Sequence, residues 1–104
     1  MQTSAKNITA AALNLLMKQK AAIQLIDVRE DYEHDEFNIG GLHLPLGAVM
    51  QNIHLVEKEI PVIIYCRKGV RSQIAIQRLE QKHSFTNLFN LEGGMESWKT
   101  ALDL

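Results

Sequence analysis

The sequence predicts an α/β fold, a small doubly wound parallel sheet flanked by helices. Short apolar stretches alternate with helical patterns along the whole chain, and this alternation indicates strands that run parallel and are joined by helices. One stretch, Val62–Tyr65, is apolar throughout, as is typical of a central strand buried on both faces. The chain has 104 residues and neither internal repeats nor a linker, so a single domain over residues 1–104 is expected.

Each element follows from its local pattern. Good helix formers after Thr9, which can act as an N-cap, predict the first helix. Gly47 and Asn52 weaken the third helical pattern, and Pro61 opens the fourth strand. Strands are expected at residue 8 as a short extended entry and over 22–28, 42–44, 62–65 and 87–91. Helices are expected over 10–19, 31–37, 46–57, 72–83 and 94–102.

Charge and composition exclude several classes of function. Lys and Arg number 11 against 12 Asp and Glu, a net charge of −1, so no global basic field predicts a nucleic-acid partner. The hydrophobic fraction is 46%, ordinary for a globular protein, and no segment approaches the roughly 20 apolar residues of a membrane helix. Residues 1–7 are polar and lack the apolar core of a secretory signal.

The chain contains one cysteine, so it can form no internal disulfide and has no thiol cluster for zinc. The four histidines show no ligand spacing and are expected at the surface, so neither a metal nor a cofactor is predicted: His34, His43, His54 and His83. A free, reactive thiol is easiest to keep in a reducing compartment, and we therefore expect a cytoplasmic protein.

The candidate catalytic residue is that single cysteine, Cys66, at the end of the apolar strand. In a parallel sheet, ligands bind beyond the carboxyl ends of the strands. The segment after the thiol carries three cations and one glycine and leads into a helix expected to begin at Ser72. Backbone N–H groups in such a loop form an anion-binding concavity, which favours thiolate over thiol. We expect an exposed, nucleophilic thiol that is also open to oxidation.

The loop residues have separate expected roles. The N–H groups of residues 67–71 would hold negative charge on sulfur, and Gly69 would permit the backbone conformation that this requires. The three cations would attract an anionic donor, with Arg71 placed for bidentate contact. Ser72 would cap the helix or donate to the sulfur. The predicted substrate-binding residues are Arg67, Lys68, Gly69, Val70, Arg71 and Ser72.

Three blocks of sequence resemble the rhodanese domains. Cys66 and Arg71 enclose four residues with glycine third, as in the active-site loop of that family. Residues 25–30, Leu-Ile-Asp-Val-Arg-Glu, are similar to its second-strand signature, and residues 91–98 to its C-terminal Gly-Gly-x-x-x-Trp element. Residues 37–45 depart from the Gly-His-Ile-Pro-Gly-Ala stretch of many members, which bears on local packing and leaves the cysteine in place.

The resemblance implies a sulfurtransferase that moves sulfane sulfur through a persulfide on Cys66. The donor would be a small sulfur compound such as thiosulfate or a persulfide, and the acceptor a thiol or cyanide, with a persulfide-carrying or thioredoxin-like protein as a further partner. Two alternatives stay open. One is a noncatalytic rhodanese-like binding or regulatory module, although relatives of that kind often lack the cysteine. The other is a cysteine phosphatase or arsenate reductase, but the tyrosine phosphatase loop is one residue longer than the loop here.

Other residues have structural interpretations. A lone cysteine after an apolar strand is often a small buried hydrophobe, and the flanking Arg and Gly residues count against that interpretation here. Asp27 and Arg29 fall on one face of a strand, which favours a structural ion pair over catalysis. Residues 92–94 are expected to shape a turn, and Trp98 to belong to the core.

Overall fold

The computed structural model describes residues 6–104 and contains a five-stranded parallel sheet with helices on both faces. The prediction that residues 1–7 lack the apolar core of a secretory signal falls largely on residues 1–5, which lie outside the described part. The strands are β1 (Lys6–Ile8), β2 (Gln24–Asp27), β3 (Leu42–His43), β4 (Val62–Tyr65) and β5 (Leu88–Leu91). The helices are α1 (Ala10–Lys18), α2 (Asp31–Glu36), α3 (Val70–Lys82) and α4 (Gly94–Ala101), with 3-10 turns η1 (Leu46–Ala48) and η2 (Met50–Leu55).

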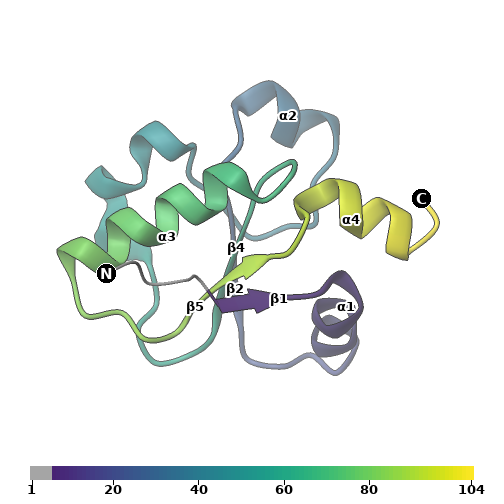
Figure 1. The fold of residues 1–104 in the computed structure, drawn as a ribbon, viewed down its shortest axis with the longest axis horizontal. Helices are drawn as coiled ribbons and strands as arrows, with labels where there is room; N and C mark the ends of the chain where they lie inside the picture. The colour runs from purple at the N-terminus through teal and green to yellow at the C-terminus, as the bar shows by residue number, and fades with distance from the viewer. Residues whose placement is uncertain (1–5) are drawn as a thin grey trace.

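The sheet has the strand order β1-β5-β4-β2-β3, and every pair is parallel. Helices α1 and α4 pack together over one face, while α3 and the two 3-10 turns cover the other, as Figure 1 shows. The doubly wound parallel sheet predicted from the sequence is therefore confirmed. The central strand is β4, which lies between β5 and β2.

Side chains of β4 alternate between two cores, because successive residues of a strand point to opposite faces. Val62 and Ile64 belong to the core beneath α3, and Cys66 continues that series one step beyond the strand. Ile63 and Tyr65 belong to the core beneath α1 and α4, together with Trp98, as expected. All four strand residues are fully buried.

Two helical predictions need correction. Residues 46–57 were expected as one α-helix, but they form the two 3-10 turns, with a break in the helical dihedrals at Asn52. Gly47 and Asn52 disfavour a continuous helix, and the segment packs apolar side chains against α3 from short turns instead. Helix α3 begins at Val70, two residues before the predicted start, because Gly69 in a left-handed conformation starts it directly.

The first helix follows the sequence closely. Thr9 Oγ1 accepts a hydrogen bond from the Ala12 amide at 3.1 Å, which is the predicted N-cap. Leu13 on its inner face is fully buried. Within residues 6–104, no helix is long and apolar enough to cross a membrane.

Candidate active site

The thiol of Cys66 lies at the carboxyl end of β4, at the base of the loop that leads into α3. The residue is only 1% exposed, so the expectation of an exposed thiol is wrong. The burial follows from strand alternation, which directs Cys66 into the core beneath α3, and from the loop that folds back over the sulfur. A reagent can reach the sulfur only when the groups covering it move.

Three hydrogen-bonding groups surround Cys66 Sγ. The backbone N–H of Gly69 donates at 3.1 Å, and the backbone N–H of Ser72 donates at 3.4 Å. The hydroxyl of Ser72 lies 3.3 Å from the sulfur, with either atom able to donate. The first turn of a helix has N–H groups without intrahelical acceptors, and the sulfur accepts a hydrogen bond from one of them. This arrangement of neutral donors is suited to a sulfur that carries negative charge.

Two glycines give the loop its shape. Gly69 has φ +97°, a left-handed conformation that side chains rarely adopt. Gly94, at the start of α4, lies so close beneath the loop that a Cβ there would come within 2.4 Å of the Cys66 carbonyl oxygen. This close approach allows the amides of Met95 and Glu96 to donate to the carbonyls of Cys66 and Arg67, at 2.8 and 3.0 Å. The base of the loop is thereby fixed to α4.

The three cations of the loop have different surroundings. Arg71 forms a two-pronged ion pair with Glu33 of α2, at 2.7 and 2.9 Å. Hydrogen bonding to Arg71 lowers the pKa of Glu33 to about 2, so the pair is ionised at neutral pH. Arg67 lies 3.4 Å from Glu96, and both side chains are largely exposed. Lys68 belongs to none of the ion pairs formed within residues 6–104.

The seven residues predicted for the site therefore have different surroundings in the structure. Gly69 and Ser72 contact the sulfur directly, while Arg71 is bound to a carboxylate that the sequence analysis did not single out. Val70 is 62% exposed and starts α3 without contacting the thiol through any described hydrogen bond.

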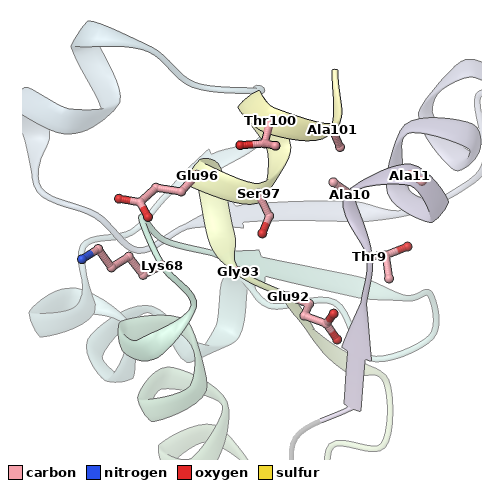
Figure 2. Close-up of a pocket in the computed structure, with 10 residues that line it drawn as sticks. All are labelled: Thr9, Ala10, Ala11, Lys68, Glu92, Gly93, Glu96, Ser97, Thr100 and Ala101. Carbon is pink, nitrogen blue, oxygen red and sulfur yellow. The ribbon is translucent and has the colours of Figure 1, made fainter. Parts of the chain in front are cut away.

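Two hollows lie beside the loop. The smaller, about 240 Å³, lies between α2 and α4, and its lining includes Arg29, Arg67 and Lys99. The larger, about 650 Å³, lies between α4 and the start of α1, and Figure 2 shows Lys68 at one side of it and Thr9 at the other. Glu96 lines both, so its pairing with Arg67 forms part of the wall between them.

A second polar cluster lies at the carboxyl end of β2. Asp27 is fully buried and accepts from the Arg29 guanidinium at 2.8 to 3.1 Å, which confirms the predicted structural ion pair. His34 Nδ1 lies 2.8 Å from Asp27, and its ring stacks on that of His43 with centroids 4.3 Å apart. Burial alone would raise the pKa of Asp27, but the hydrogen bonds from Arg29 and His34 outweigh it, so that the pKa lies below its ordinary value.

The expectation that all four histidines lie at the surface is therefore wrong for two of them. The side chains of His34 and His43 are each 21% exposed, and His43 Nε2 donates to the Arg29 carbonyl at 2.8 Å. Both rings pack around the buried Asp27–Arg29 pair. The polar atoms of this pair lie away from water and therefore need hydrogen-bond partners within the protein.

The profile of the rhodanese-like domain family matches residues 9–101, nearly the entire described chain. This protein belongs to the rhodanese-like domain family. The fold agrees, since a rhodanese-related protein from Thermoplasma volcanium superimposes with a TM-score of 0.79 at 27% identity, covering 92% of each chain.

Two relatives by sequence are informative. An uncharacterized Bacillus subtilis protein, YqhL, is 40% identical over 76 residues, which are 72% of this chain and 60% of the relative. The thiosulfate sulfurtransferase GlpE of Coxiella burnetii is 34% identical over 82 residues, which are 78% of this chain and 76% of the relative. This rhodanese-like domain thus has relatives that are named as sulfurtransferases.

Two residues that contribute to the site did not stand out in the sequence. Glu33 lies 38 positions before Arg71, and only the packing of α2 near the start of α3 brings them together. Asn90 is 2% exposed within β5 and binds the Ser72 hydroxyl. A signal for Asn90 did exist, because an asparagine inside the apolar run 88–91 needs a buried hydrogen-bond partner.

Proposed function

We propose that this rhodanese-like domain is a sulfurtransferase that carries sulfur as a persulfide on Cys66. One observation carries the proposal: the N–H groups of Gly69 and Ser72 both point at Sγ, with the Ser72 hydroxyl beside them. A purely structural buried cysteine has no need of two amide donors. A thiolate or persulfide does, because an anionic sulfur out of water must have its charge held by donors.

The reaction would proceed in two displacements. The Cys66 thiolate attacks the outer sulfur of thiosulfate, an Sγ–S bond forms, and the sulfur–sulfur bond of thiosulfate breaks with its electron pair leaving on sulfite. A cyanide or thiolate acceptor then attacks the outer sulfur of the persulfide. The Sγ–S bond breaks, its electron pair returns to Sγ, and the products are thiocyanate or a new persulfide. No external oxidant, metal or cofactor enters either step.

The cations of the loop would act in different ways. Among the ion pairs formed within residues 6–104, Arg67 and Arg71 face carboxylates and Lys68 has no such partner, so Lys68 would attract an anionic donor. Arg71, bound to Glu33, would hold the start of α3 in register with α2 and so keep the Ser72 amide aimed at the sulfur. A donor that entered would have to displace part of the cover over the sulfur, because Cys66 is 1% exposed.

The donor and acceptor are proposed by class. A small sulfur donor such as thiosulfate or a persulfide would load Cys66, and a thiol, cyanide, or a persulfide-carrying or thioredoxin-like protein would unload it. The near-neutral charge offers no basis for a nucleic-acid partner. We place this chemistry in the cytoplasm, where a lone free thiol is kept reduced.

Mass spectrometry of the intact protein tests the proposal. After incubation with thiosulfate or polysulfide, the protein should gain the mass of one sulfur atom, which cyanide or excess thiol then removes. The Cys66→Ser variant should keep the fold and neither gain the sulfur nor transfer it, since a hydroxyl at neutral pH is a poor sulfur nucleophile. Its circular dichroism spectrum serves as the control for folding.

Two results would contradict the proposal. Absence of an adduct with every donor would favour a noncatalytic module, and transfer by Cys66→Ser near the parent rate would mean that another residue acts. Hydrolysis of an aryl phosphate that requires Cys66, in the absence of a persulfide, would indicate the phosphatase alternative.

A further inference from the structure

A row of polar side chains runs from the buried sulfur of Cys66 to the edge of the sheet. Ser72 Oγ donates to Oδ1 of Asn90, and Asn90 Nδ2 donates to Oδ1 of Asn7 at 3.2 Å. Asn7 and Asn90 are register partners on the neighbouring strands β1 and β5. Ser72 is fully buried and Asn90 is 2% exposed, whereas Asn7 lies at the exposed end of the row.

This row has no explanation in packing alone. At the same level of the sheet, the register continues from Asn90 to Ile64 and then to Ile26, both fully or almost fully buried and apolar. An apolar residue at position 90 would extend that core. An amide there must instead be held by hydrogen bonds, and those bonds lead directly to the group beside the sulfur.

The Ser72 hydroxyl has one proton to donate and two neighbouring atoms that can accept it, Asn90 Oδ1 and Cys66 Sγ. An amide oxygen can only accept, so the observed bond to Asn90 Oδ1 uses that proton. The hydroxyl then presents a lone pair toward Sγ at 3.3 Å, which suits a neutral S–H group that donates. The arrangement in the structure is thus the one that fits the thiol.

A thiolate or persulfide requires the opposite direction. An anionic sulfur only accepts, and a hydrogen bond to it is stronger than one to a neutral amide oxygen. When Ser72 turns its proton to the sulfur, Asn90 Oδ1 loses its donor in a buried site. A half-turn of the Asn90 amide exchanges its oxygen and nitrogen in the same volume, so that Nδ2 donates to Ser72 Oγ and Oδ1 faces Asn7. Asn7 is exposed and can turn its own amide to donate.

We propose that Asn90, supported by Asn7, is a positioning residue that lets the Ser72 hydroxyl reverse its hydrogen bond as the charge on Cys66 changes. The two amides form a relay with two directions: in one the sulfur donates, and in the other it accepts. No proton passes along the relay, because only the hydroxyl and the two amides rotate. The proposal rests on the sulfurtransferase function for its role in catalysis.

Asparagine is the side chain that such a relay requires. It offers one donor and one acceptor group of similar size that exchange by rotation. A carboxylate can only accept, so an aspartate at the outer end would hold Asn90 with Nδ2 turned outward. The Ser72 hydroxyl would then continue to donate to Asn90 Oδ1 and could not donate to an anionic sulfur. This consequence can be tested at Asn7, whose exposure makes its substitution compatible with folding.

The experiment compares Asn7→Asp with Asn7→Ala, each with Ser72 intact and in a Ser72→Ala background. Two rates are measured at fixed pH: alkylation of Cys66 by iodoacetamide, and formation of the persulfide from thiosulfate. With Ser72 intact, Asn7→Asp should slow both rates about threefold to tenfold relative to Asn7→Ala, the worth of one hydrogen bond. In the Ser72→Ala background the two variants should agree within about twofold, because the charge of the exposed aspartate acts there alone, without a hydroxyl whose direction it could fix.

A second cycle tests Asn90 itself. Asn90→Leu should slow both rates when Ser72 is intact and change them less than about twofold in the Ser72→Ala background. Asn87→Leu is the matched control, since Asn87 precedes the same strand and its amide donates to the carbonyls of Glu57 and Ile60. It should lower thermal stability without changing either rate.

The outcomes separate the relay from the enzyme. Equal slowing by Asn7→Asp in both backgrounds would mean a simple charge effect and would overturn the relay. The relay would also be overturned if Asn90→Leu slowed the two rates equally with Ser72 intact and in the Ser72→Ala background. If the parent forms no persulfide, the proposed function fails, and the alkylation rates still decide whether the relay follows the charge on sulfur.

Discussion

Two buried polar centres lie at the carboxyl ends of the neighbouring strands β2 and β4. At the end of β2, the Asp27 carboxylate is surrounded by Arg29 and His34. At the end of β4, the Cys66 sulfur is surrounded by two backbone amides and the Ser72 hydroxyl. Both atoms are almost completely buried, and both sit where a parallel sheet places its functional groups.

The difference between them is the kind of donor. Asp27 faces a full countercharge and is ionised at neutral pH, so its centre is closed and has a structural role. Cys66 faces neutral donors, which accommodate a thiol, a thiolate or a persulfide without fixing one of them. The Arg71 guanidinium of the loop is bound to Glu33 instead. A countercharge fixed on the sulfur would oppose the return to the neutral thiol, whereas amides allow the sulfur to change state.

The largest expected effect on stability comes from breaking the β2 centre. Asp27→Asn removes the countercharge and leaves the Arg29 guanidinium buried, with only neutral acceptors among its described partners: the new amide oxygen and the Phe37 carbonyl at 2.6 Å. Loss of one partner of a buried ion pair costs about 3–5 kcal/mol. Urea unfolding at pH 7 should show a decrease of this size, while persulfide formation in the folded fraction should stay near the parent rate.

The control for this variant is Asp35→Asn, which is exposed on α2. It should change the unfolding free energy by no more than about 0.5 kcal/mol. If Asp27→Asn were as stable as the parent, the β2 centre would not have the structural role described. If instead it abolished persulfide formation in folded protein, the two centres would be parts of a single site.

A smaller effect is expected at the glycine that shapes the β4 centre. Gly69→Ala must hold a side chain at φ +97°, which costs about 1–2 kcal/mol and displaces the amide that donates to Sγ. The stability should fall by that amount, and persulfide formation from thiosulfate should slow about tenfold or more, as when one donor to a reactive anion is lost.

Gly40→Ala provides a matched control, because Gly40 has φ +90° and nothing within 4 Å of its missing Cβ. It should show a similar loss of stability with an unchanged rate. Equal slowing by the two variants would assign the effect to general destabilisation and would remove Gly69 from the sulfur site.

The fold and the position of the thiol could be predicted from the sequence, because they depend on local patterns. The apolar run at Val62–Tyr65 and the glycine after Cys66 determine where the strand ends and how the chain turns. Strand alternation also placed Asp27 and Arg29 on one face. These features involve residues close together in the chain, where spacing largely decides geometry.

The way the loop covers the thiol and the partner of Arg71 could not be predicted in this way. Arg71 pairs with a residue 38 positions earlier, and the stacking of His34 on His43 depends on how α2 meets β3. The position of a helix relative to the sheet is set by side-chain packing over the whole core. The sequence shows that Arg71 is a cation near a thiol, and only the packed structure shows that Glu33 binds it.

The smallest expected effect concerns that ion pair and its dependence on pH. The pKa of Glu33 is about 2 in the folded protein, against an ordinary value of 4.5, because Arg71 hydrogen-bonds to it. A carboxylate with a lowered pKa adds stability that is fully present above the ordinary value and is lost as the pH falls toward the folded value. Allowing for partial exposure to solvent, we expect Glu33→Gln to cost about 1–2 kcal/mol at pH 7.

Urea unfolding of the parent and of Glu33→Gln at pH 7, 5 and 3 tests this expectation. The difference between them should be full at pH 7 and nearly so at pH 5, and should shrink at pH 3, because the uncharged glutamine resembles a protonated Glu33. Glu36→Gln, exposed on the same helix, should differ from the parent by no more than about 0.5 kcal/mol at each pH. A difference for Glu33→Gln that stayed constant down to pH 3 would show that shape, and not charge, joins α2 to the loop. The β4 centre would then be held in place by packing alone. It would differ from the charged β2 centre both in the donors at the sulfur and in the contacts that support those donors.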